Sequence, residues 1–575
     1  MKLIVHYLKN YKKMFLLNIF SVFGFALVEL GIPTIVADMV DKGVMTGNTR
    51  YIWKMGLIIA LISVLGVMGT ILLGYCCSYL STSITRDIRN DIFGKTQSFS
   101  HSEFNNFGIS SLITRTNSDA FQIQIFLNIL FRTALMTPVM MIASFVLVIR
   151  SSVSLSLIIA STVPLIVLGV IWVGKKSKPI SEYQQTSLEG INRISKENLT
   201  GIRVIRAFNN DWYEKERFEQ ENDRYKDYSK QMYKLMTLTQ PVFFLLMNLA
   251  GAAIFWVAGH LIDSSSLEVG QLMSFMDYLF HAMFSVMLFC TVFMMYPKAE
   301  VSTRRIRKVL DTKPLVKNTA NVISLTGDAD TIEFEHVTFV YPDGEEAVLK
   351  DISFQVRKGE TVAFIGSTGS GKSTLVNLVP RAYNVTNGVI KINGKCIEEY
   401  DIPSLRDAIG FIPQKAQLFR GTFADNIRFG KKDASMDEMI HAAKTAQAYD
   451  FIMEKGGFDQ RITEGATNIS GGQKQRLSIA RALVRHPKIY IFDDSFSALD
   501  FKTDALLRRE LRRETGDAIV MIVAQRVSSI MNANHIIVLN EGKIVGNGTH
   551  KELLRNCPIY YEIAASQLSE EELAQ

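Results

Sequence analysis

Cysteine is scarce in this sequence of 575 residues and shows no metal-binding spacing. The five cysteines are Cys76, Cys77, Cys290, Cys396 and Cys557. None of them forms a CxxC pair, which a zinc site or a thiol redox motif of the usual kind would contain. We therefore interpret all five as free, reduced thiols that pack in the interior.

Charge is also limited, since Asp, Glu, Lys and Arg make up 21% of the chain and hydrophobic residues 48%. The net charge of +7 is the kind of balance that nucleic-acid binding would use. Many of the basic residues, however, flank long apolar runs, as the orientation of membrane helices requires. We therefore expect a lipid bilayer as a partner and no nucleic acid.

Six apolar runs are long enough to cross a bilayer, which takes about 20 mostly apolar residues. They lie at about 14–37, 54–80, 125–149, 152–174, 241–262 and 271–296. Only a tight turn near residues 150–152 separates the third run from the fourth. A chain of this length is too long for one core. We therefore predict a membrane domain over residues 1–310, a linker over 311–330 and a second domain over 331–575.

The orientation of the six runs follows from the basic residues beside them. Basic clusters precede the first run, separate the second from the third and the fourth from the fifth, and follow the sixth. The connection 263–270, DSSSLEVG, has no basic residue. Both chain termini are thus expected in the cytoplasm of a bacterial cell, with very short outer loops.

The two long inner connections, 81–124 and 175–240, have little glycine or proline and keep helical spacing. We expect them to continue the membrane helices into the cytoplasm. Within the second connection, VIRAFNNDWYEKERF (204–218) mixes aromatic and charged residues. This segment is either a docking surface for another domain or a plain solvated helix.

The second domain carries a phosphate-binding loop, GSTGSGKST (366–374), directly after the strand-like segment TVAFI. In this motif Gly366, Gly369 and Gly371 let backbone N–H groups turn toward phosphate oxygens. Lys372 neutralises the β- and γ-phosphates, and the Ser373 hydroxyl binds Mg²⁺. The residues expected to contact ATP here are Gly366, Ser367, Thr368, Gly369, Ser370, Gly371, Lys372, Ser373 and Thr374.

Two adjacent acids end the apolar segment IYIF near residue 490. Asp493 closes a predicted strand and fits a second Mg²⁺ contact, direct or through water. Asp494 follows at the place from which a carboxylate can polarise the attacking water. Upstream, Ser470, Gly471, Gly472 and Gln473 open a helix whose N-terminus suits phosphate. Since one phosphate cradle is already present, this second one points to the nucleotide of a partner.

With these motifs in place, residues 331–565 resemble the nucleotide-binding domain of ABC transporters, and the six runs resemble the membrane domain of ABC exporters. The resemblance implies a half-transporter with six membrane helices, long cytoplasmic extensions and an α/β P-loop NTPase domain, which binds ATP and Mg²⁺. It also implies that Tyr341 stacks on adenine, that Gln414 contacts Mg²⁺ and the water, and that the Ser470 region is the signature facing the partner's ATP. Ser497, Ala498, Leu499 and Asp500 resemble the loop at the dimer seam. Residues 103–119 and 204–214 resemble the two coupling regions, and Glu464 lies where the family contacts them.

Two positions depart from the family pattern. Asp494 stands where a catalytic glutamate is usual, and Gln525 stands where a histidine is usual. A carboxylate shorter by one methylene lies ~1.5 Å farther from the water, and a misplacement on the order of 1 Å can cost ~100-fold in rate. Gln525 can donate a hydrogen bond but carries no charge near neutral pH.

The sequence therefore predicts a site that binds ATP but hydrolyses it slowly, with Asp494, Gln525 and Gln414 in the catalytic positions. The signature stays close to the family pattern, so we expect a heterodimer in which it serves a competent site on a second half-transporter. A homodimer with two slow sites, a lipid or peptide exporter, and a regulatory ATP-sensing subunit are the alternatives. The expected substrate class is small hydrophobic or amphiphilic compounds, as in multidrug exporters.

The substrate cavity is indicated by polar and adaptable residues inside the membrane runs. Met273, Met276 and Phe284 are either a wall for varied apolar ligands or a surface toward lipid and neighbouring helices. Asp277 and His281 lie four residues apart on one helical face, so they either pair with each other or attract a cationic substrate. Glu29 in the first run is a similar candidate, and its alternative interpretation is a bond to a neighbouring helix or a place near the membrane interface.

Overall fold

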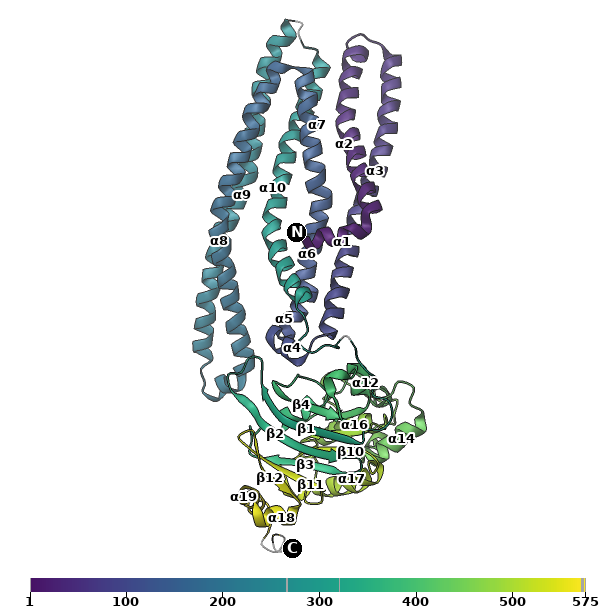
Figure 1. Ribbon diagram of the computed structural model, residues 1–575. Helices are drawn as coiled ribbons and strands as arrows, with labels where there is room; N and C mark the ends of the chain where they lie inside the picture. The colour runs from purple at the N-terminus through teal and green to yellow at the C-terminus, as the bar shows by residue number, and fades with distance from the viewer. Residues whose placement is uncertain (1, 265–266, 320, 570–572, 574–575) are drawn as a thin grey trace. The chain divides into compact units, whose positions relative to one another are not determined.

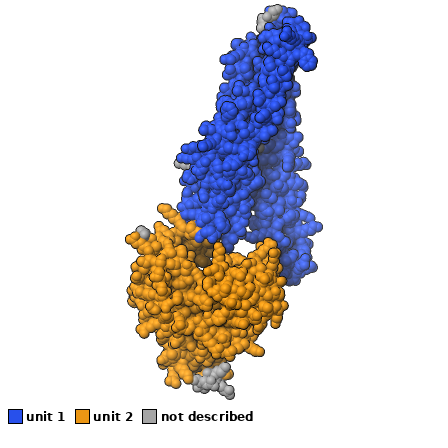
Figure 2. Space-filling model, turned by 90° about the vertical axis from the view of Figure 1, so that its right-hand side faces the viewer, with its two compact units in different colours: residues 1–97, 109–312 blue, residues 98–108, 313–575 orange. Residues whose placement is uncertain are grey.

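The computed structural model describes all residues except 1, 265–266, 320, 570–572 and 574–575. The chain forms two compact units, shown in different colours in Figure 2. Unit 1 contains residues 1–97 and 109–312, and unit 2 contains residues 98–108 and 313–575. Residues 98–108 thus belong with the C-terminal unit although they lie between two membrane helices in the sequence.

Unit 1 is helical throughout its described secondary structure (Figure 1). Its α-helices are α1 (Lys2–Leu8), α2 (Lys12–Met39), α3 (Thr49–Gln97), α5 (Ile109–Thr114), α6 (Ala120–Ile129), α7 (Leu135–Ser151), α8 (Val153–Ala207), α9 (Asp211–Asp263) and α10 (Val269–Asp311). A 3₁₀ turn, η1 (Lys9–Tyr11), and three π-helical segments, η2 (Val40–Val44), η3 (Arg115–Asp119) and η4 (Leu130–Ala134), join or interrupt them.

Six helical stretches among the described residues are long and apolar enough to cross a membrane. Each of the six runs expected from the sequence falls on one of them. Helix α8 has 55 residues, which at 1.5 Å per residue gives about 80 Å, far more than the ~30 Å of a hydrocarbon core. The second inner connection therefore continues the membrane helices α8 and α9, as expected, whereas the first follows α3 only to Gln97 and is then interrupted by residues 98–108, which belong to unit 2. Residues 265–266 of the short loop 263–270 lie outside the described residues.

The tight turn between the third and fourth runs is a helix cap. Helix α7 ends at Ser151, and α8 begins at Val153. Ser152 between them has an extended backbone, and its Oγ accepts a hydrogen bond from the Leu155 N–H at 3.4 Å. A serine at this position satisfies an N–H group that the first turn of a helix leaves unpaired, so the chain reverses within one residue.

Helices α8 and α9 run antiparallel and side by side along their length (Figure 1). Their register is fixed by the Gln184 Nε2–Ser229 Oγ hydrogen bond of 2.9 Å and by the stacked rings of Tyr183 and Tyr228, whose centroids lie 5.3 Å apart. Within unit 1 the remaining membrane helices pack chiefly as α2 on α3 and α10 on α7.

Unit 2 is built on two main sheets (Figure 1). The six-stranded sheet has the order β12-β11-β3-β10-β9-β6, in which only β12 is antiparallel to its neighbour. Its strands are β3 (Thr361–Gly366), β6 (Ile409–Ile412), β9 (Ile489–Asp493), β10 (Ile519–Val523), β11 (His535–Asn540) and β12 (Lys543–Gly548). Strands β3 and β9 flank β10, so their carboxyl ends meet at one edge of the sheet.

The second sheet is antiparallel and has the order β2-β1-β4-β5. Its strands are β1 (Thr331–Val340), β2 (Ala347–Arg357), β4 (Asn387–Ile392) and β5 (Lys395–Cys396), and a short pair is formed by β7 (Gly421–Thr422) and β8 (Arg461–Ile462). The helices of unit 2 are α4 (His101–Phe107), α11 (Lys372–Leu378), α12 (Ile402–Asp407), α13 (Phe423–Arg428), α14 (Met436–Thr445), α15 (Tyr449–Glu454), α16 (Gly471–Leu483), α17 (Phe501–Glu514), α18 (His550–Asn556) and α19 (Pro558–Ala565).

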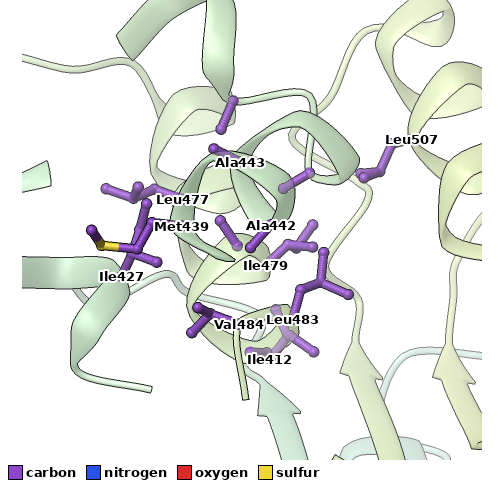
Figure 3. Close-up of a cluster of buried hydrophobic side chains, with 14 of the residues drawn as sticks. Ile412, Ile427, Met439, Ala442, Ala443, Leu477, Ile479, Leu483, Val484 and Leu507 are labelled. Carbon is purple, nitrogen blue, oxygen red and sulfur yellow. The ribbon is translucent and has the colours of Figure 1, made fainter. Parts of the chain in front are cut away.

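A hydrophobic core holds α16 against its neighbours (Figure 3). Leu477, Ile479 and Leu483 of α16 meet Ile427 of α13 and side chains of α14 there, and all are almost fully buried. At roughly 2–5 kcal/mol for truncating a buried leucine or isoleucine to alanine, these contacts fix the position of the helix that the Ser470 motif begins.

Candidate nucleotide-binding site

The phosphate-binding loop follows β3 and leads into α11, the strand–loop–helix order that the motif requires. Gly371 has φ +96°, and a Cβ there would lie 2.8 Å from Leu349 Cδ2. A Cβ on Gly366 would lie 2.0 Å from the Leu539 carbonyl oxygen. Gly369 has φ +84° but open space around it. At Gly366 and Gly371 a side chain would lack space, whereas at Gly369 glycine is needed for its backbone conformation alone.

Lys372 lies inside this loop. Its Nζ donates to the carbonyl oxygens of Gly366 at 2.9 Å and Ser367 at 2.7 Å. The side chain is largely buried, and burial lowers the pKa of Lys372 while the nearby carboxylates of Asp494 and Asp493 oppose that shift. The cation is therefore held where phosphate oxygens would arrive, bonded to neutral carbonyls that compete weakly with an anion.

Ser373 and Asp493 meet at the carboxyl ends of β3 and β9. The Ser373 Oγ donates to Asp493 Oδ1 at 2.7 Å. Burial raises the pKa of Asp493, the hydrogen bond from Ser373 lowers it, and the neighbouring Asp494 raises it further. A hydroxyl and a carboxylate in contact are hard oxygen ligands of the kind Mg²⁺ prefers, so these two residues fit the metal position expected from the sequence.

Asp494 lies one residue farther, beyond the end of β9, and has a left-handed backbone with φ +48°. One of its oxygens, Oδ2, accepts hydrogen bonds from two side-chain amides, Gln414 Nε2 at 3.0 Å and Gln525 Nε2 at 2.7 Å. Burial raises the pKa of Asp494, whereas the Gln414 hydrogen bond, the charge of Lys372 and the Gln525 hydrogen bond lower it. The structure thus brings together the three residues expected in the catalytic positions.

Tyr341 lies just beyond the end of β1, and its hydroxyl is 2.8 Å from the Thr374 hydroxyl of α11. Sequence reasoning missed Tyr383, whose ring stands edge-on to Tyr341 at a centroid distance of 5.3 Å. On its other side Tyr383 lies 5.9 Å from the His101 ring of α4. No sequence signal pointed to Tyr383, because its contacts with Tyr341 and His101 join segments that are far apart in the chain.

The Ser470 motif caps α16. The Ser470 Oγ accepts from the Gln473 N–H at 3.3 Å, and the Gln473 side chain accepts from the Ser470 N–H at 3.0 Å. Among the described residues, no hydrogen bond or ring contact joins residues 470–473 to the phosphate loop of the same chain. Ser470 and Gly471 are exposed and Gly472 and Gln473 are half-buried, which leaves the start of the motif available to a second nucleotide.

The loop Ser497, Ala498, Leu499 and Asp500 lies between Asp494 and α17. The Ser497 Oγ donates to the Asp494 carbonyl oxygen at 3.0 Å, and Asp500 caps α17 by accepting from the Thr503 N–H at 2.9 Å. A Cβ on Gly472 would lie 3.1 Å from the Ala498 carbonyl oxygen. The loop therefore touches both the Asp494 end of the site and the helix that carries the Ser470 motif.

The first of the two expected coupling regions divides between the units. Residues 98–108 belong to unit 2, and there the Glu103 carboxylate accepts from the Leu315 N–H at 3.0 Å and from the Ser100 N–H at 2.7 Å. The second region forms the tip between α8 and α9, where Phe208 is 75% and Trp212 65% exposed. Large exposed aromatic side chains at a helix tip are typical of a contact surface. Glu464 lies in an exposed 3₁₀ turn of unit 2.

The residues proposed for a substrate cavity lie on α2 and α10. Met273 and Asp277 are exposed, whereas Met276, His281 and Phe284 are half-buried. His281 Nε2 lies 3.9 Å from Glu29 Oε1. The imidazole therefore faces a carboxylate on another helix, and Glu29 and His281, which the sequence treated separately, form one polar contact inside the membrane unit.

The helical unit with six candidate spans and the second unit with a nucleotide-binding loop define an ATP-hydrolysing membrane transporter. The chain matches the family models for the ABC transporter transmembrane region over residues 15–287 and for the ABC transporter over residues 349–497. The chain belongs to the ABC transporter family and is a half-transporter of the exporter type.

Its relatives cover nearly the whole chain. An uncharacterized ABC transporter ATP-binding protein of Mycobacterium tuberculosis is 38% identical over 94% of this chain and 94% of its own length. YfiB of Bacillus subtilis, also an uncharacterized ABC transporter ATP-binding protein, is 36% identical over 95% and 94%. An ATP-dependent lipid A-core flippase of Syntrophus aciditrophicus is 30% identical over 87% and 83%. The solved structure of a bacterial Atm1-family ABC exporter with ATP bound has a TM-score of 0.80 at 26% identity and covers 97% of this chain and 99% of that one.

Proposed function

We propose that this chain is one half of a heterodimeric exporter of hydrophobic or amphiphilic compounds, and that its own ATP site hydrolyses slowly. The observation that carries the proposal is the environment of Asp494, whose Oδ2 accepts from the amides of both Gln414 and Gln525. A general base needs a free carboxylate oxygen within about 3 Å of the water from which it takes a proton. Here the carboxylate is short, and one of its two oxygens is engaged by two donors.

Gln525 adds to this effect because an amide can neither take up a proton nor gain charge near neutral pH. An imidazole at the same place could do both. With a shortened carboxylate and an amide neighbour, both groups that would handle the proton of the attacking water are changed. We infer that ATP stays bound in this site for longer than the partner's site takes to complete one transport cycle.

The groups that would hold nucleotide are intact, which supports binding without fast turnover. Tyr341 would stack on adenine, and Lys372 with the N–H groups of the 366–374 loop would hold the phosphates. Ser373, Gln414 and Asp493 would hold Mg²⁺, and the contact between the Ser373 hydroxyl and the Asp493 carboxylate fits that ion. When bound, Mg²⁺ neutralises the charge that develops on the transferred phosphate.

The geometry and exposure of the Ser470 motif support the proposal that the partner is a different chain. It keeps its capping geometry and exposure, so it can complete a nucleotide site on a second half-transporter. In the complex that we propose, one composite site uses this chain's phosphate loop and is slow. The other uses the partner's phosphate loop with Ser470, Gly471, Gly472 and Gln473, and it supplies the turnover that drives transport.

ATP binding would draw the two nucleotide-binding units together, and residues 103–119 and 204–214 would pass this motion to the membrane helices. We place the protein in a bacterial plasma membrane with both termini and the nucleotide-binding unit in the cytoplasm. The substrate would meet Met273, Met276, Phe284 and the polar residues Asp277, His281 and Glu29.

Export of a lipid is the second candidate substrate class. Two relatives, each 30% identical to this chain, carry the name ATP-dependent lipid A-core flippase. A lipid is itself a hydrophobic amphiphile, so the same helices could serve either cargo. Transport assays with fluorescent lipids and with cationic dyes in the same vesicles separate the two.

The experiment that tests the asymmetry compares two substitutions in the purified complex of this chain with its partner. We expect Asp494→Asn to change phosphate release little and replacement of the partner's catalytic glutamate to abolish it. The chain purified alone should show little ATPase activity. Equal losses from the two substitutions would refute the proposed asymmetry between the two sites. If the complex responds to ATP but transports neither the fluorescent lipids nor the cationic dyes, a regulatory subunit is favoured.

A further inference from the structure

A groove with a cavity volume of about 100 Å³ lies between α8 and α9 and is also lined by Met287 of α10. Its floor contains the buried side chains of Ile166 and Phe243, and its rim contains Leu165, Trp172 and Leu238, each more than half exposed. The groove is thus an open slot on the surface of the helix pair.

The lining is almost entirely hydrocarbon. Of the described residues that line the groove, only Thr239 and Trp172 carry a polar side-chain atom. The Thr239 hydroxyl donates to the Leu235 carbonyl oxygen of its own helix at 3.0 Å, so it has no free proton to offer a ligand. A polar ligand body would lose its hydration here without gaining hydrogen bonds. The part of a ligand that fits is an alkyl chain.

Lysines lie at one end of this groove, on both helices. Lys176 is one turn beyond Trp172 on the same face of α8, and its Nζ lies 5.0 Å from the centre of the Trp172 ring. Lys234 is one turn before Leu238 on α9, on the stripe that lines the groove. The α8–α9 register, in which residue 184 lies opposite residue 229, places both lysines at the same end. Lys175, Lys178 and Lys230 lie close by in the sequence.

These lysines have no anionic partner in the part of the chain that the structure describes. Among the described residues, none of the five makes an ion pair, and all are exposed. A tryptophan with lysines beyond it is typical of the boundary between hydrocarbon and headgroups. An apolar slot that ends in unpaired cations at this depth is complementary to an anionic phospholipid.

We propose that the groove binds an anionic phospholipid of the cytoplasmic leaflet, with one acyl chain between α8 and α9 and the phosphate at Lys176 and Lys234. The assignment of the leaflet uses the topology proposed above, whereas the recognition itself needs only the groove and the two lysines. The proposed site goes beyond the transport cycle, because the lipid bound there would stay with the protein and would not be its cargo.

The test uses the full chain in its complex, reconstituted in phosphatidylcholine vesicles. The vesicles contain one of two probe lipids, phosphatidylglycerol or phosphatidylcholine, each with a photoactivatable acyl chain. Peptide mass spectrometry then locates the crosslinks. We expect labelling of residues 165–173 and 235–246, with phosphatidylglycerol favoured. One lysine near an anionic headgroup is worth about fivefold, so two favour phosphatidylglycerol by about 5- to 30-fold.

Two pairs of variants separate headgroup recognition from occupation of the groove. The double variant Lys176→Gln, Lys234→Gln should bring the preference close to one, whereas Lys12→Gln, Lys13→Gln, which removes the same charge elsewhere, should leave it unchanged. Gly169→Leu should lower labelling by both lipids several-fold, because a Cβ on Gly169 meets open space in the groove. Gly174→Leu is the matched control, since its Cβ also meets open space but Gly174 is not among the residues that line the groove.

Three results would overturn the proposal. Equal labelling by the two lipids in the unmodified protein would show that the lysines do not select a headgroup. Labelling that Gly169→Leu leaves intact would show that the acyl chain lies elsewhere. Protection of the groove in the complex, with crosslinks only on the partner chain, would show that a protein helix covers it.

Discussion

Lengthening Asp494 to glutamate should restore hydrolysis at this chain's own nucleotide site. The substitution moves the carboxylate by ~1.5 Å toward the water, and a placement error of about 1 Å can cost on the order of 100-fold. A glutamate could also reach past the amides of Gln414 and Gln525, which bind Asp494 Oδ2 at 3.0 and 2.7 Å. We therefore expect Asp494→Glu to raise turnover by about 10- to 100-fold, or ~1.4–2.7 kcal/mol in the barrier.

The same substitution should cost stability. Asp494 has φ +48°, a conformation that aspartate and asparagine adopt more readily than residues with longer side chains. Glutamate there loses on the order of 1 kcal/mol. Asp494→Asn keeps the side-chain length and should leave the melting temperature nearly unchanged. A lower melting temperature together with faster turnover is therefore the expected signature of Asp494→Glu.

The assay is phosphate release by the complex in which the partner's catalytic glutamate has been replaced by glutamine. Only the site with this chain's phosphate loop can then contribute. Gln525→His added to Asp494→Glu should give more than the product of the single effects, because side chains 494 and 525 contact each other and substitutions at contacting residues are not additive. If Asp494→Glu binds ATP normally and turnover rises by less than about threefold, carboxylate reach is not what limits this site.

Two further substitutions test the nucleotide contacts. Tyr341→Ala should weaken binding of a fluorescent ATP analogue by roughly 5- to 150-fold, the range for loss of one base–aromatic stack. Tyr341→Phe keeps the ring, so its binding should stay within about threefold of the unmodified protein. Equal effects of the two substitutions would mean that the hydroxyl matters and the ring does not. Gly371→Ala and Gly369→Ala should each cost the ~1–2 kcal/mol of a left-handed backbone, but Gly371→Ala should weaken ATP binding more, because its Cβ would also meet the Val348 carbonyl oxygen at 3.0 Å and Leu349 Cδ2 at 2.8 Å, whereas Gly369 has open space around it. Thermal shift with and without ATP compares the two glycines, and equal losses would contradict the steric argument.

The sequence predicted the membrane helices well because their signal is local. A run of about 20 apolar residues needs no knowledge of the rest of the chain, and each of the six expected runs falls on a candidate span. The phosphate loop was equally predictable, since its glycines and Lys372 act within nine consecutive residues. In both cases the physical cause lies in the segment itself.

Contacts between distant segments could not be predicted in this way. Helical spacing brought Asp277 and His281 to one face of α10, but the structure places His281 3.9 Å from Glu29 of α2. Residues 98–108 looked like part of the membrane half, yet the Glu103 carboxylate binds the Leu315 N–H, 212 positions away. Periodicity describes the neighbours that a residue has on its own helix, and it is silent about the other helices.

The two adjacent acids show how one backbone angle separates two chemical roles. Asp493 ends β9, and its carboxylate accepts a hydrogen bond from the Ser373 hydroxyl at the position proposed for the metal. Asp494 follows with φ +48°, so the chain turns and its carboxylate meets the amides of Gln414 and Gln525 instead. A change at Asp494 can therefore alter the handling of water while the Ser373–Asp493 contact stays in place. This separation supports the proposal above: the residues that would hold ATP and Mg²⁺ can stay in place while the residues that would handle the water change, and a half-transporter with such a site would depend on a partner for turnover.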